Sequence, residues 1–252
     1  MAKGLASLQS VERAFRVLDG VGRLGKPASL SEIATEADID KSAAQRMVNT
    51  LLELGYLERN ATRVGYVPGR RVLALAYNYL RNTPIVERAT PVLLELRRNA
   101  RERVDLSLFD ETTIVYAVRL QSKRENFPAT LVGRRIPAFA STGGRAMMSL
   151  MQPAEVQAIL DASEMKPITA KTICDREGVL KEIEKARQLG YALAAEESLP
   201  GEVVLAAAVN GAAGEPVAAV HIAGSLSEWT VEDFRARFSP LAMEAAQALS
   251  NR

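Results

Sequence analysis

The stretch "DIDKSAAQRMVNTLLELGYL", Asp38 to Leu57, decides the fold of the N-terminal part of the chain, because it reads as one helix with two distinct faces. The apolar face has the i, i+3, i+4, i+7 spacing of a helix that packs on a core, and it consists of Ala44, Met47, Val48 and Leu51. A second face with the same spacing carries only hydroxyl, amide and guanidinium groups, from Ser42, Gln45, Arg46 and Asn49. Solvated helix faces usually mix Lys and Glu, whereas these groups suit contacts with base edges and phosphates. The pattern alone is equally compatible with a solvated face, so the surrounding elements have to decide.

The neighbouring segments predict a winged helix-turn-helix. Ser29 and Glu32 have the spacing of a capping box that opens a short helix, and Asp40 is placed to cap the helix with the polar stripe. Gly55 ends that helix, and two short β-type runs around a polar turn follow as far as Pro68. An earlier amphipathic helix precedes all of these. The order helix, helix, turn, longer helix and β-hairpin is that of a winged helix-turn-helix, whose longer helix enters the major groove.

The charge distribution supports a nucleic-acid partner for this part of the chain. The formal net charge of the whole sequence is only +2, which is too small for a general polyanion binder. Residues 1–80 nevertheless hold 11 Lys and Arg against 8 Asp and Glu. The basic excess is sharpest in residues 59–71, which carry Arg59, Arg63, Arg70 and Arg71 and no acid. Solubility is the competing explanation for these arginines, because exposed and phosphate-binding arginines look identical in sequence.

The remaining composition excludes several classes of site. Cys174 is the only cysteine and His221 the only histidine, so an intrachain disulfide and a Cys/His metal centre are both excluded. The start "MAKGLASLQSVERAFRV" lacks the apolar region of a signal peptide, and no apolar run reaches membrane-spanning length. We therefore expect a cytoplasmic protein without a membrane association, a metal or a cofactor. His221 and Cys174 have no catalytic partner at a recognisable spacing, so no catalytic residue is predicted, and the paired acids Glu196 and Glu197 fit a solvated loop.

The rest of the chain predicts an α+β domain. "RRVLALAYNYL" reads as a linker helix over about 70–82, and a second amphipathic helix covers Ile85 to about Ala100. "VDLSLF" and "TTIVYAVRL" read as strands, "PATLVGRRIPAFA" as broken strands, and "STGGRAMMSLM" as a turn into a helix. A clear helix in "EGVLKEIEKARQLGY", a strand in "YALAAEE", and a hairpin of two long apolar strands around "GAAGEP" follow, before a C-terminal helix.

In sequence blocks and their order, the chain resembles the IclR family of bacterial transcriptional regulators. "SVERAFRVLD", "LSEIATEADIDKSAAQRMVNTLLELGYLER" and "YVPGRRVLALA" resemble the family's N-terminal winged helix and linker. "GRRIPAFASTGGRAMMSL" resembles its pocket segment, and "ARQLGYALAAEESLPGEVVLAAAV" with "GEPVAAVHIAG" its C-terminal signature. The resemblance implies a winged helix-turn-helix over 1–69, a linker helix over 70–82, and a GAF-like α+β effector domain with an antiparallel sheet over 83–252. It also implies a homo-dimer or a dimer of dimers that binds double-stranded operator DNA, as a repressor or an activator.

The site residues follow from the stripe, the basic segment and the resemblance together. The predicted DNA-binding residues are Ser29, Lys41, Ser42, Ala43, Gln45, Arg46, Asn49, Arg59, Arg63 and Arg70. The predicted effector-binding residues are Leu106, Phe127, Ile136, Phe139, Ser141, Thr142, Gly143, Ala194, Glu202, Val204 and Ala206. An intracellular enzyme or ligand carrier with an accessory helical domain is the competing hypothesis.

Departures from the family pattern predict the character of the effector pocket. Phe139 stands where the family usually has His, Arg145 where it has Lys, Val204 where Cys is frequent, Ala194 where Asp is frequent, and Asp38 where Gly is usual. "STGGRA" lacks the spacing of a phosphate-binding loop, and it fits either a small-residue turn or a helix start whose free N–H groups bind a carboxylate. With apolar walls from Ile136, Phe139, Val204 and Ala206, this predicts a small organic acid with an apolar body, aromatic acids included.

Overall fold

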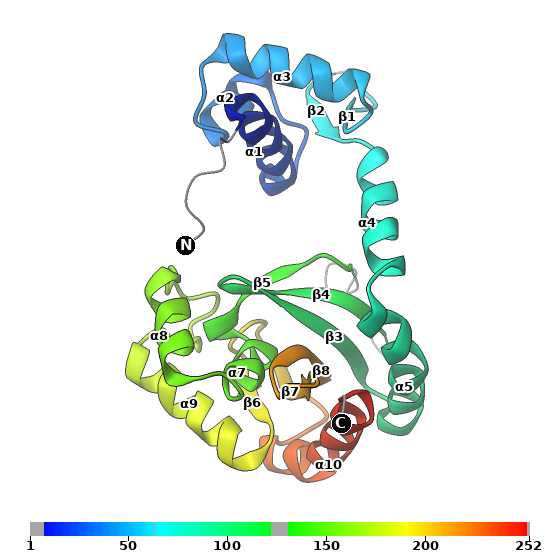
Figure 1. The fold of residues 1–252 in the computed structure, drawn as a ribbon, viewed down its shortest axis with the longest axis vertical. Coiled ribbons are helices and arrows are strands. Elements are labelled where there is room, and N and C mark those ends of the chain that lie inside the picture. The colour runs from blue at the N-terminus through cyan, green and yellow to red at the C-terminus, as the bar shows by residue number, and fades with distance from the viewer. Residues whose placement is uncertain (1–7, 63, 122–130, 251–252) are drawn as a thin grey trace. The chain divides into compact units, whose positions relative to one another are not determined.

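The computed structural model describes residues 8–62, 64–121 and 131–250. The chain forms two compact units, 1–82 and 83–252, which we call the N-terminal unit and the C-terminal unit (Figure 1). No helix among the described residues is long and apolar enough to cross a membrane.

The N-terminal unit is a winged helix-turn-helix followed by a helix. Its elements are α1 (Gln9–Leu24), α2 (Leu30–Glu36), α3 (Lys41–Glu53), β1 (Leu57–Arg59), β2 (Tyr66–Pro68) and α4 (Arg71–Arg81). β1 and β2 pair antiparallel as the wing, and Ala28 adds one bridge to Tyr66. Fully buried side chains from α1, α2, α3 and β1 form the core, including Val17, Ile33, Val48 and Leu57.

Local capping positions α3 as the sequence predicts. Ser29 Oγ accepts a hydrogen bond from the Glu32 N–H, and Glu32 Oε2 accepts one from the Ser29 N–H, which starts α2. In the turn between the helices Asp38 adopts a left-handed backbone with φ of 50°, which Asp tolerates better than most residues. The Asp40 carboxylate then accepts a hydrogen bond from the Ala43 N–H at 2.8 Å and caps α3.

The C-terminal unit is an α+β domain with one antiparallel sheet, and a GAF-like description is consistent with it. Its elements are α5 (Pro84–Ala100), β3 (Arg103–Asp110), β4 (Thr113–Leu120), β5 (Arg135–Pro137), η1 (Ala138–Ala140), α7 (Thr142–Met148), α8 (Pro153–Ala162), α9 (Arg176–Leu189), β6 (Ala192–Ala195), β7 (Glu202–Asn210), β8 (Pro216–Ser225) and α10 (Val231–Leu249). The strand order in the sheet is β5-β4-β3-β8-β7-β6.

The two faces of this sheet differ in polarity. α5 and α10 pack on one face over a cluster of buried side chains that includes Leu93, Leu106, Leu205, Phe234 and Phe238 (Figure 1). α7 packs on the other face, where the alternation of the strands places Arg103, Asp105 and Ser107 of β3 beside His221 of β8. Burying polar side chains under a helix costs free energy unless they are paired. This face is therefore the part of the unit where a functional site is expected.

Two expectations for this unit need correction. The broken strands expected in "PATLVGRRIPAFA" reduce, within the described residues, to β5 over 135–137 followed by the short 3-10 helix η1. α8 was not expected at all, although Gln152, Pro153 and Glu155 carry a helix-start signal: Glu155 Oε2 accepts a hydrogen bond from the Gln152 N–H at 2.9 Å.

Candidate functional site

The polar stripe of α3 lies on the surface of the N-terminal unit. Ser42, Arg46 and Asn49 are exposed and Gln45 is half-buried. Gln45 Nε2 donates to Asn49 Oδ1 at 2.8 Å, and Ser42 Oγ donates to Asp40 Oδ1 at 2.6 Å. That Ser42 bond and the Ala43 N–H hold the pKa of Asp40 below its ordinary value. Among the described residues the Arg46 guanidinium has no hydrogen bond or ion pair, so its donors are available to a ligand.

The other predicted DNA-binding residues lie in different surroundings. Ser29 and Lys41 are exposed, at the starts of α2 and α3. Arg59 lies on the wing with its guanidinium carbon 4.7 Å from the centre of the Tyr66 ring, and exposed Arg70 pairs with Glu58 at 3.1 Å.

One DNA-binding prediction is contradicted and one is outside the described residues. Ala43 is wrong, because its side chain is buried in the core side of α3 and cannot reach a base. Its backbone N–H donates to the Asp40 carboxylate that caps α3. Arg63 lies outside the residues that the structure describes.

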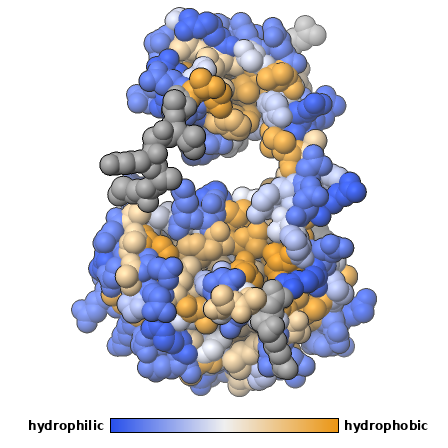
Figure 2. Space-filling view, in the orientation of Figure 1, coloured by the Kyte–Doolittle hydropathy of each residue, from blue (hydrophilic) through white to orange (hydrophobic). Residues whose placement is uncertain are grey.

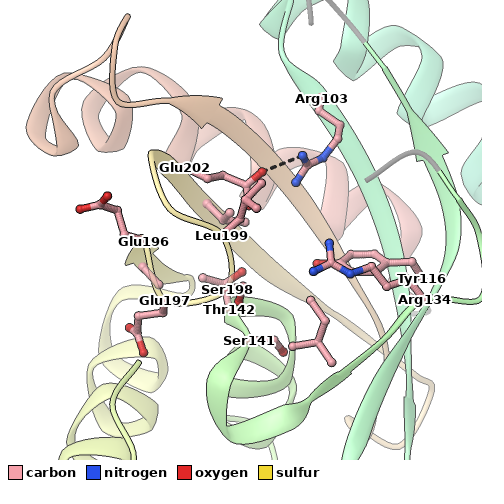
Figure 3. Close-up of a pocket in the computed structure, with 13 residues that line it drawn as sticks. Arg103, Tyr116, Arg134, Ser141, Thr142, Glu196, Glu197, Ser198, Leu199 and Glu202 are labelled. Carbon is pink, nitrogen blue, oxygen red and sulfur yellow. Dashed lines mark ion pairs between the residues drawn. The ribbon is translucent and has the colours of Figure 1, made fainter. Parts of the chain in front are cut away.

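The C-terminal unit contains a cavity between the polar sheet face, the start of α7 and the loop between β6 and β7 (Figure 3). It is lined by Arg103, Tyr116, Arg134, Ile136, Ser141, Thr142, Ala194, Glu196, Glu197, Ser198, Leu199, Glu202 and Val204. Six of the predicted effector-binding residues lie here: Ile136, Ser141, Thr142, Ala194, Glu202 and Val204. The cavity therefore brings together residues that are up to about one hundred positions apart in the chain, from Arg103 to Val204.

A buried ion-pair network forms the sheet side of the cavity. Arg103 pairs with Glu202 at 2.7 Å and with Asp105 at 3.0 Å, and Arg119 pairs with Asp105 at 3.1 Å. Burial alone would lower the pKa of Arg103, but the carboxylates of Asp105 and Glu202 outweigh burial and raise it. The Tyr116 ring lies against this network, with the Arg119 guanidinium carbon 4.0 Å from its centre. The network is neutral as a whole, so it shapes the cavity without giving it a net charge.

A second buried pair fixes the loop on the other side of the cavity. The Arg145 guanidinium donates to both carboxylate oxygens of Glu197, each at 2.7 Å, and its Nε donates to the Phe139 carbonyl at 2.8 Å. Glu197 also accepts a hydrogen bond from the Ile173 N–H at 3.0 Å. The expectation that Glu197 is a solvated loop acid is therefore wrong: its carboxylate ties the β6–β7 loop to α7.

Three effector-binding predictions are contradicted by the side-chain positions. Leu106 is wrong because it faces α5 and α10 in the core, and Phe139 is wrong because it packs with α8 and α9. Ala206 is wrong as well, because it is buried against α7 and α9. The prediction for Gly143 concerns its backbone N–H at the start of α7, which side-chain positions do not test, and it stays a prediction. Phe127 lies outside the described residues. The expectation of an apolar pocket consequently fails: the cavity walls are mostly polar, with Ile136, Leu199 and Val204 as the larger apolar side chains.

Several lining residues were missed in the sequence. Arg103 could have been found from the strand alternation, because polar residues at every second position of "RVDLSLF" indicate a polar sheet face. Tyr116 lies on the next strand, where it pairs with Ser107 of that face. Arg134, Ser198 and Leu199 carry no such pattern, since they come from irregular segments.

His221 lies under this site and is fully buried. Ser107 Oγ is 2.8 Å from His221 Nε2, and a Cβ at Gly143 would lie 2.4 Å from the ring, so α7 sits directly on the histidine. This closed packing leaves no room for a substrate, and the pair is structural. Burial lowers the pKa of His221 to about 4.

The low pKa of His221 predicts an acid-sensitive fold. The unfolded chain binds the proton near pH 6.5 and the folded chain only near pH 4, so stability is lost as the pH falls between these values. Between pH 7 and pH 5 the loss attributable to this group is about 2 kcal/mol. Because His221 is the only histidine, its C2–H proton resonance can be followed directly by NMR. We expect no titration of this resonance above pH 5, and a midpoint near 6.5 would refute the assignment.

Comparison with known proteins identifies both units. The family model "IclR helix-turn-helix domain" matches residues 10–61, and "Bacterial transcriptional regulator IclR C-terminal" matches residues 77–251. The Pca regulon regulatory protein of Pseudomonas putida is 25% identical over 250 residues, which cover 99% of this chain and 82% of that protein.

Solved structures show the same arrangement of elements. The crystal structure of Thermotoga maritima IclR is 26% identical, has a TM-score of 0.71, and the match covers 96% of this chain and 98% of that one. An IclR homolog from Microbacterium hydrocarbonoxydans, solved in complex with 4-hydroxybenzoate, shares the fold with a TM-score of 0.75 at 21% identity, over 96% of this chain and 97% of that one. The two family models together match nearly the whole chain, and the structure has the winged helix and the α+β unit with a cavity that they describe. The protein therefore belongs to the IclR family of DNA-binding bacterial transcriptional regulators, with an effector-binding C-terminal domain.

Proposed function

We propose that this regulator binds a near-palindromic operator as a homo-dimer or a dimer of dimers, and that a small organic acid in the cavity of the C-terminal unit changes operator binding. The observation that carries the proposal is the exposed polar stripe of α3 on a winged helix-turn-helix, in a chain whose other unit has a polar cavity. Family membership excludes the enzyme alternative, because the relatives are transcriptional regulators.

The stripe supports direct contacts with base edges. Arg46 presents a guanidinium that has no partner in the described part of the chain. Gln45 and Asn49 present an amide pair that can exchange its mutual hydrogen bond for bonds to a base. Ser29, Lys41, Arg59 and Arg70 would then lie at the phosphates, where they fix the register of the helix in the groove.

An Arg46→Ala variant is expected to lose about 1–3 kcal/mol of operator binding, because a guanidinium that binds a guanine edge is removed. Binding is measured by mobility shift on an operator obtained by selection with the wild-type protein. Arg16→Ala is the matched control, since it removes an exposed arginine of α1 and the same charge. Equal binding by Arg46→Ala and wild type would contradict direct readout by α3.

Apolar surface on the N-terminal unit supports dimerisation. The helix α4 has no buried residue, and Leu73, Leu75, Tyr77 and Tyr79 are each at least half exposed. Figure 2 shows hydrophobic surface, coloured orange, on the N-terminal unit. Leu75 also lines an apolar groove together with side chains of α1 and α3, including Phe15, Met47 and Leu54. Monomers rarely leave this much contiguous apolar surface in water, so a second copy of the chain is the natural cover.

The cavity supports an organic-acid effector. It combines hydroxyl and guanidinium donors with an apolar wall of Ile136, Leu199 and Val204, which suits an acid with an apolar body. The homolog solved with 4-hydroxybenzoate makes aromatic acids suitable first candidates.

The coupling between the two sites is tested by measuring operator affinity with and without acids. Benzoate, 4-hydroxybenzoate, pyruvate and glyoxylate are titrated into the protein–operator complex, and fluorescence anisotropy reports the operator affinity. An effector must shift this affinity, since a ligand that binds both states equally shifts nothing. A specific operator complex that no acid changes would contradict the effector part of the proposal, whereas failure to select any operator would contradict the whole.

A further inference from the structure

Most charged side chains that the structure describes around the cavity are paired with an opposite charge, and Arg134 and Glu196 are the two that are not. Arg103 and Arg119 share the two carboxylates of Asp105 and Glu202, and these four groups cancel. Arg145 and Glu197 form a separate closed pair. Among the described residues, Arg134 has no carboxylate partner and no side-chain hydrogen bond, although it lines the cavity.

The remaining acid of the wall does not compensate Arg134. Glu196 adopts a left-handed backbone with φ of 61°, its Oε1 accepts a hydrogen bond from the Gly201 N–H at 3.0 Å, and its side chain points away from the cavity (Figure 3). Arg134 instead extends toward the middle of the cavity from the side of β5 (Figure 3). Counting only the residues that the structure describes, the cavity therefore faces one positive charge without a carboxylate partner, that of Arg134, and it lies on the sheet side.

The start of α7 is less suited to bind an anion than the sequence indicates. The helix has only seven residues, and Ser141 Oγ already accepts the Gly144 N–H at 2.9 Å. The cation beneath the helix, Arg145, is neutralised by Glu197. A carboxylate placed at Ser141 would thus meet little net positive potential.

Two hydroxyl groups without a partner among the described residues line the same cavity as Arg134. The Tyr116 hydroxyl makes no hydrogen bond with a described residue, and burial raises the pKa of Tyr116, so this group stays a donor at neutral pH. The Thr142 hydroxyl likewise has no partner in the described part of the chain. One cation and two neutral donors facing an otherwise neutral cavity are complementary to a single carboxylate with a second acceptor.

We propose that Arg134 is the residue that selects the charge of the effector: its guanidinium binds the carboxylate of a monoanionic acid, while Tyr116 and Thr142 donate to that carboxylate or to a neighbouring acceptor. This inference rests on the proposed effector function of the cavity. It moves the acid-binding position from the start of α7 to the sheet side, and the apolar body of the ligand then lies on Ile136, Leu199 and Val204.

The test compares matched acids and amides, because an amide keeps the shape and loses the charge. Isothermal titration calorimetry measures benzoate, 4-hydroxybenzoate, pyruvate and glyoxylate, each beside its primary amide, with wild type, Arg134→Gln and Arg134→Lys. Arg135→Gln is the matched control, since Arg135 is the adjacent arginine and pairs with Asp110 outside the cavity. A thermal melt of each variant, with unchanged Tm, excludes misfolding.

At least one acid should bind wild type and Arg135→Gln about 10-fold or more tightly than its amide. In Arg134→Gln this preference should disappear, with the acid weakened about 10- to 100-fold and the amide unchanged, and Arg134→Lys should recover part of it. An acid preference that survives in Arg134→Gln would overturn the assignment of Arg134 and leave the acid effector intact. If no acid binds wild type better than its amide, the assignment and the acid effector both fall, while operator binding by the N-terminal unit is unaffected.

Discussion

An Arg145→Met variant is expected to lose about 3–5 kcal/mol of the free energy of unfolding of the C-terminal unit, because it leaves the Glu197 carboxylate buried without its cation. The Arg145 side chain is 1% exposed and that of Glu197 8%, so bulk water is a poor replacement for the lost partner. The Phe139 carbonyl loses its donor as well. Urea unfolding followed by circular dichroism measures the loss, which is a large fraction of the total stability of a domain of this size.

The double variant Arg145→Met with Glu197→Gln separates a broken ion pair from lost packing. The amide oxygen of Gln can still accept the Ile173 N–H, and no charge remains buried. We expect the double variant to recover at least 1 kcal/mol relative to Arg145→Met, since removing both charges of a buried pair costs less than removing one. A single variant within 1 kcal/mol of wild type would show that the pair is solvated in solution and does not fix the loop.

The winged helix-turn-helix could be predicted because its signals are local. Each signal involves residues close together in the chain. Ser29 and Glu32 form the capping box and Asp40 caps the helix through the Ala43 N–H, in both cases across three positions, while Asp38 needs only its own left-handed backbone. All three features are present in the structure. Local signals of this kind can be read from spacing alone. The start of α8 at Gln152 and Pro153 is a local signal of the same kind, so this helix is predictable from the sequence as well.

The cavity could be predicted only in part, because tertiary contacts make it. Arg145 and Glu197 are 52 positions apart, and nothing in either segment indicates the partner. Phe139 illustrates the opposite error, since family position suggested a pocket residue and the 3-10 turn of η1 directs the ring into the core with α8 and α9. The polarity of the cavity wall depends on which side chains are not packed into the core and therefore face the cavity. The spacing of residues in the sequence does not reveal this.

Leu75→Asp is expected to abolish dimerisation through the N-terminal unit and to weaken operator binding about 100- to 10,000-fold. Leu75 is half exposed on α4 and lines the apolar groove with Phe15 and Leu54, so a partner that covers the groove would bury it. An aspartate there would be desolvated without a cation, and the gain of about 1.5–3 kcal/mol from burying the leucine would be lost as well.

The large effect on DNA follows from linking two recognition helices. When two units bind two half-sites together, the second contact is intramolecular, and this linkage raises the affinity about 100- to 10,000-fold over one unit alone. Spacing between half-sites is then set by the dimer, which is why the operator should be a near-palindrome. Analytical ultracentrifugation measures the oligomeric state at micromolar protein, and mobility shift on full and half operators measures the affinity.

Asn78→Asp is the matched control, because it adds the same charge to an exposed position of α4 that does not line the groove. This variant should sediment and bind like wild type. The control thereby distinguishes the effect of an added charge on α4 from the effect of losing an apolar side chain in the groove. If Leu75→Asp also sediments and binds like wild type, the groove is not the dimer contact. If wild type is a monomer that binds a half operator as tightly as a full one, operator binding does not need two linked recognition helices. In the expected outcome, replacing Leu75 alone prevents two copies of α3 from binding the two half-sites of the operator together.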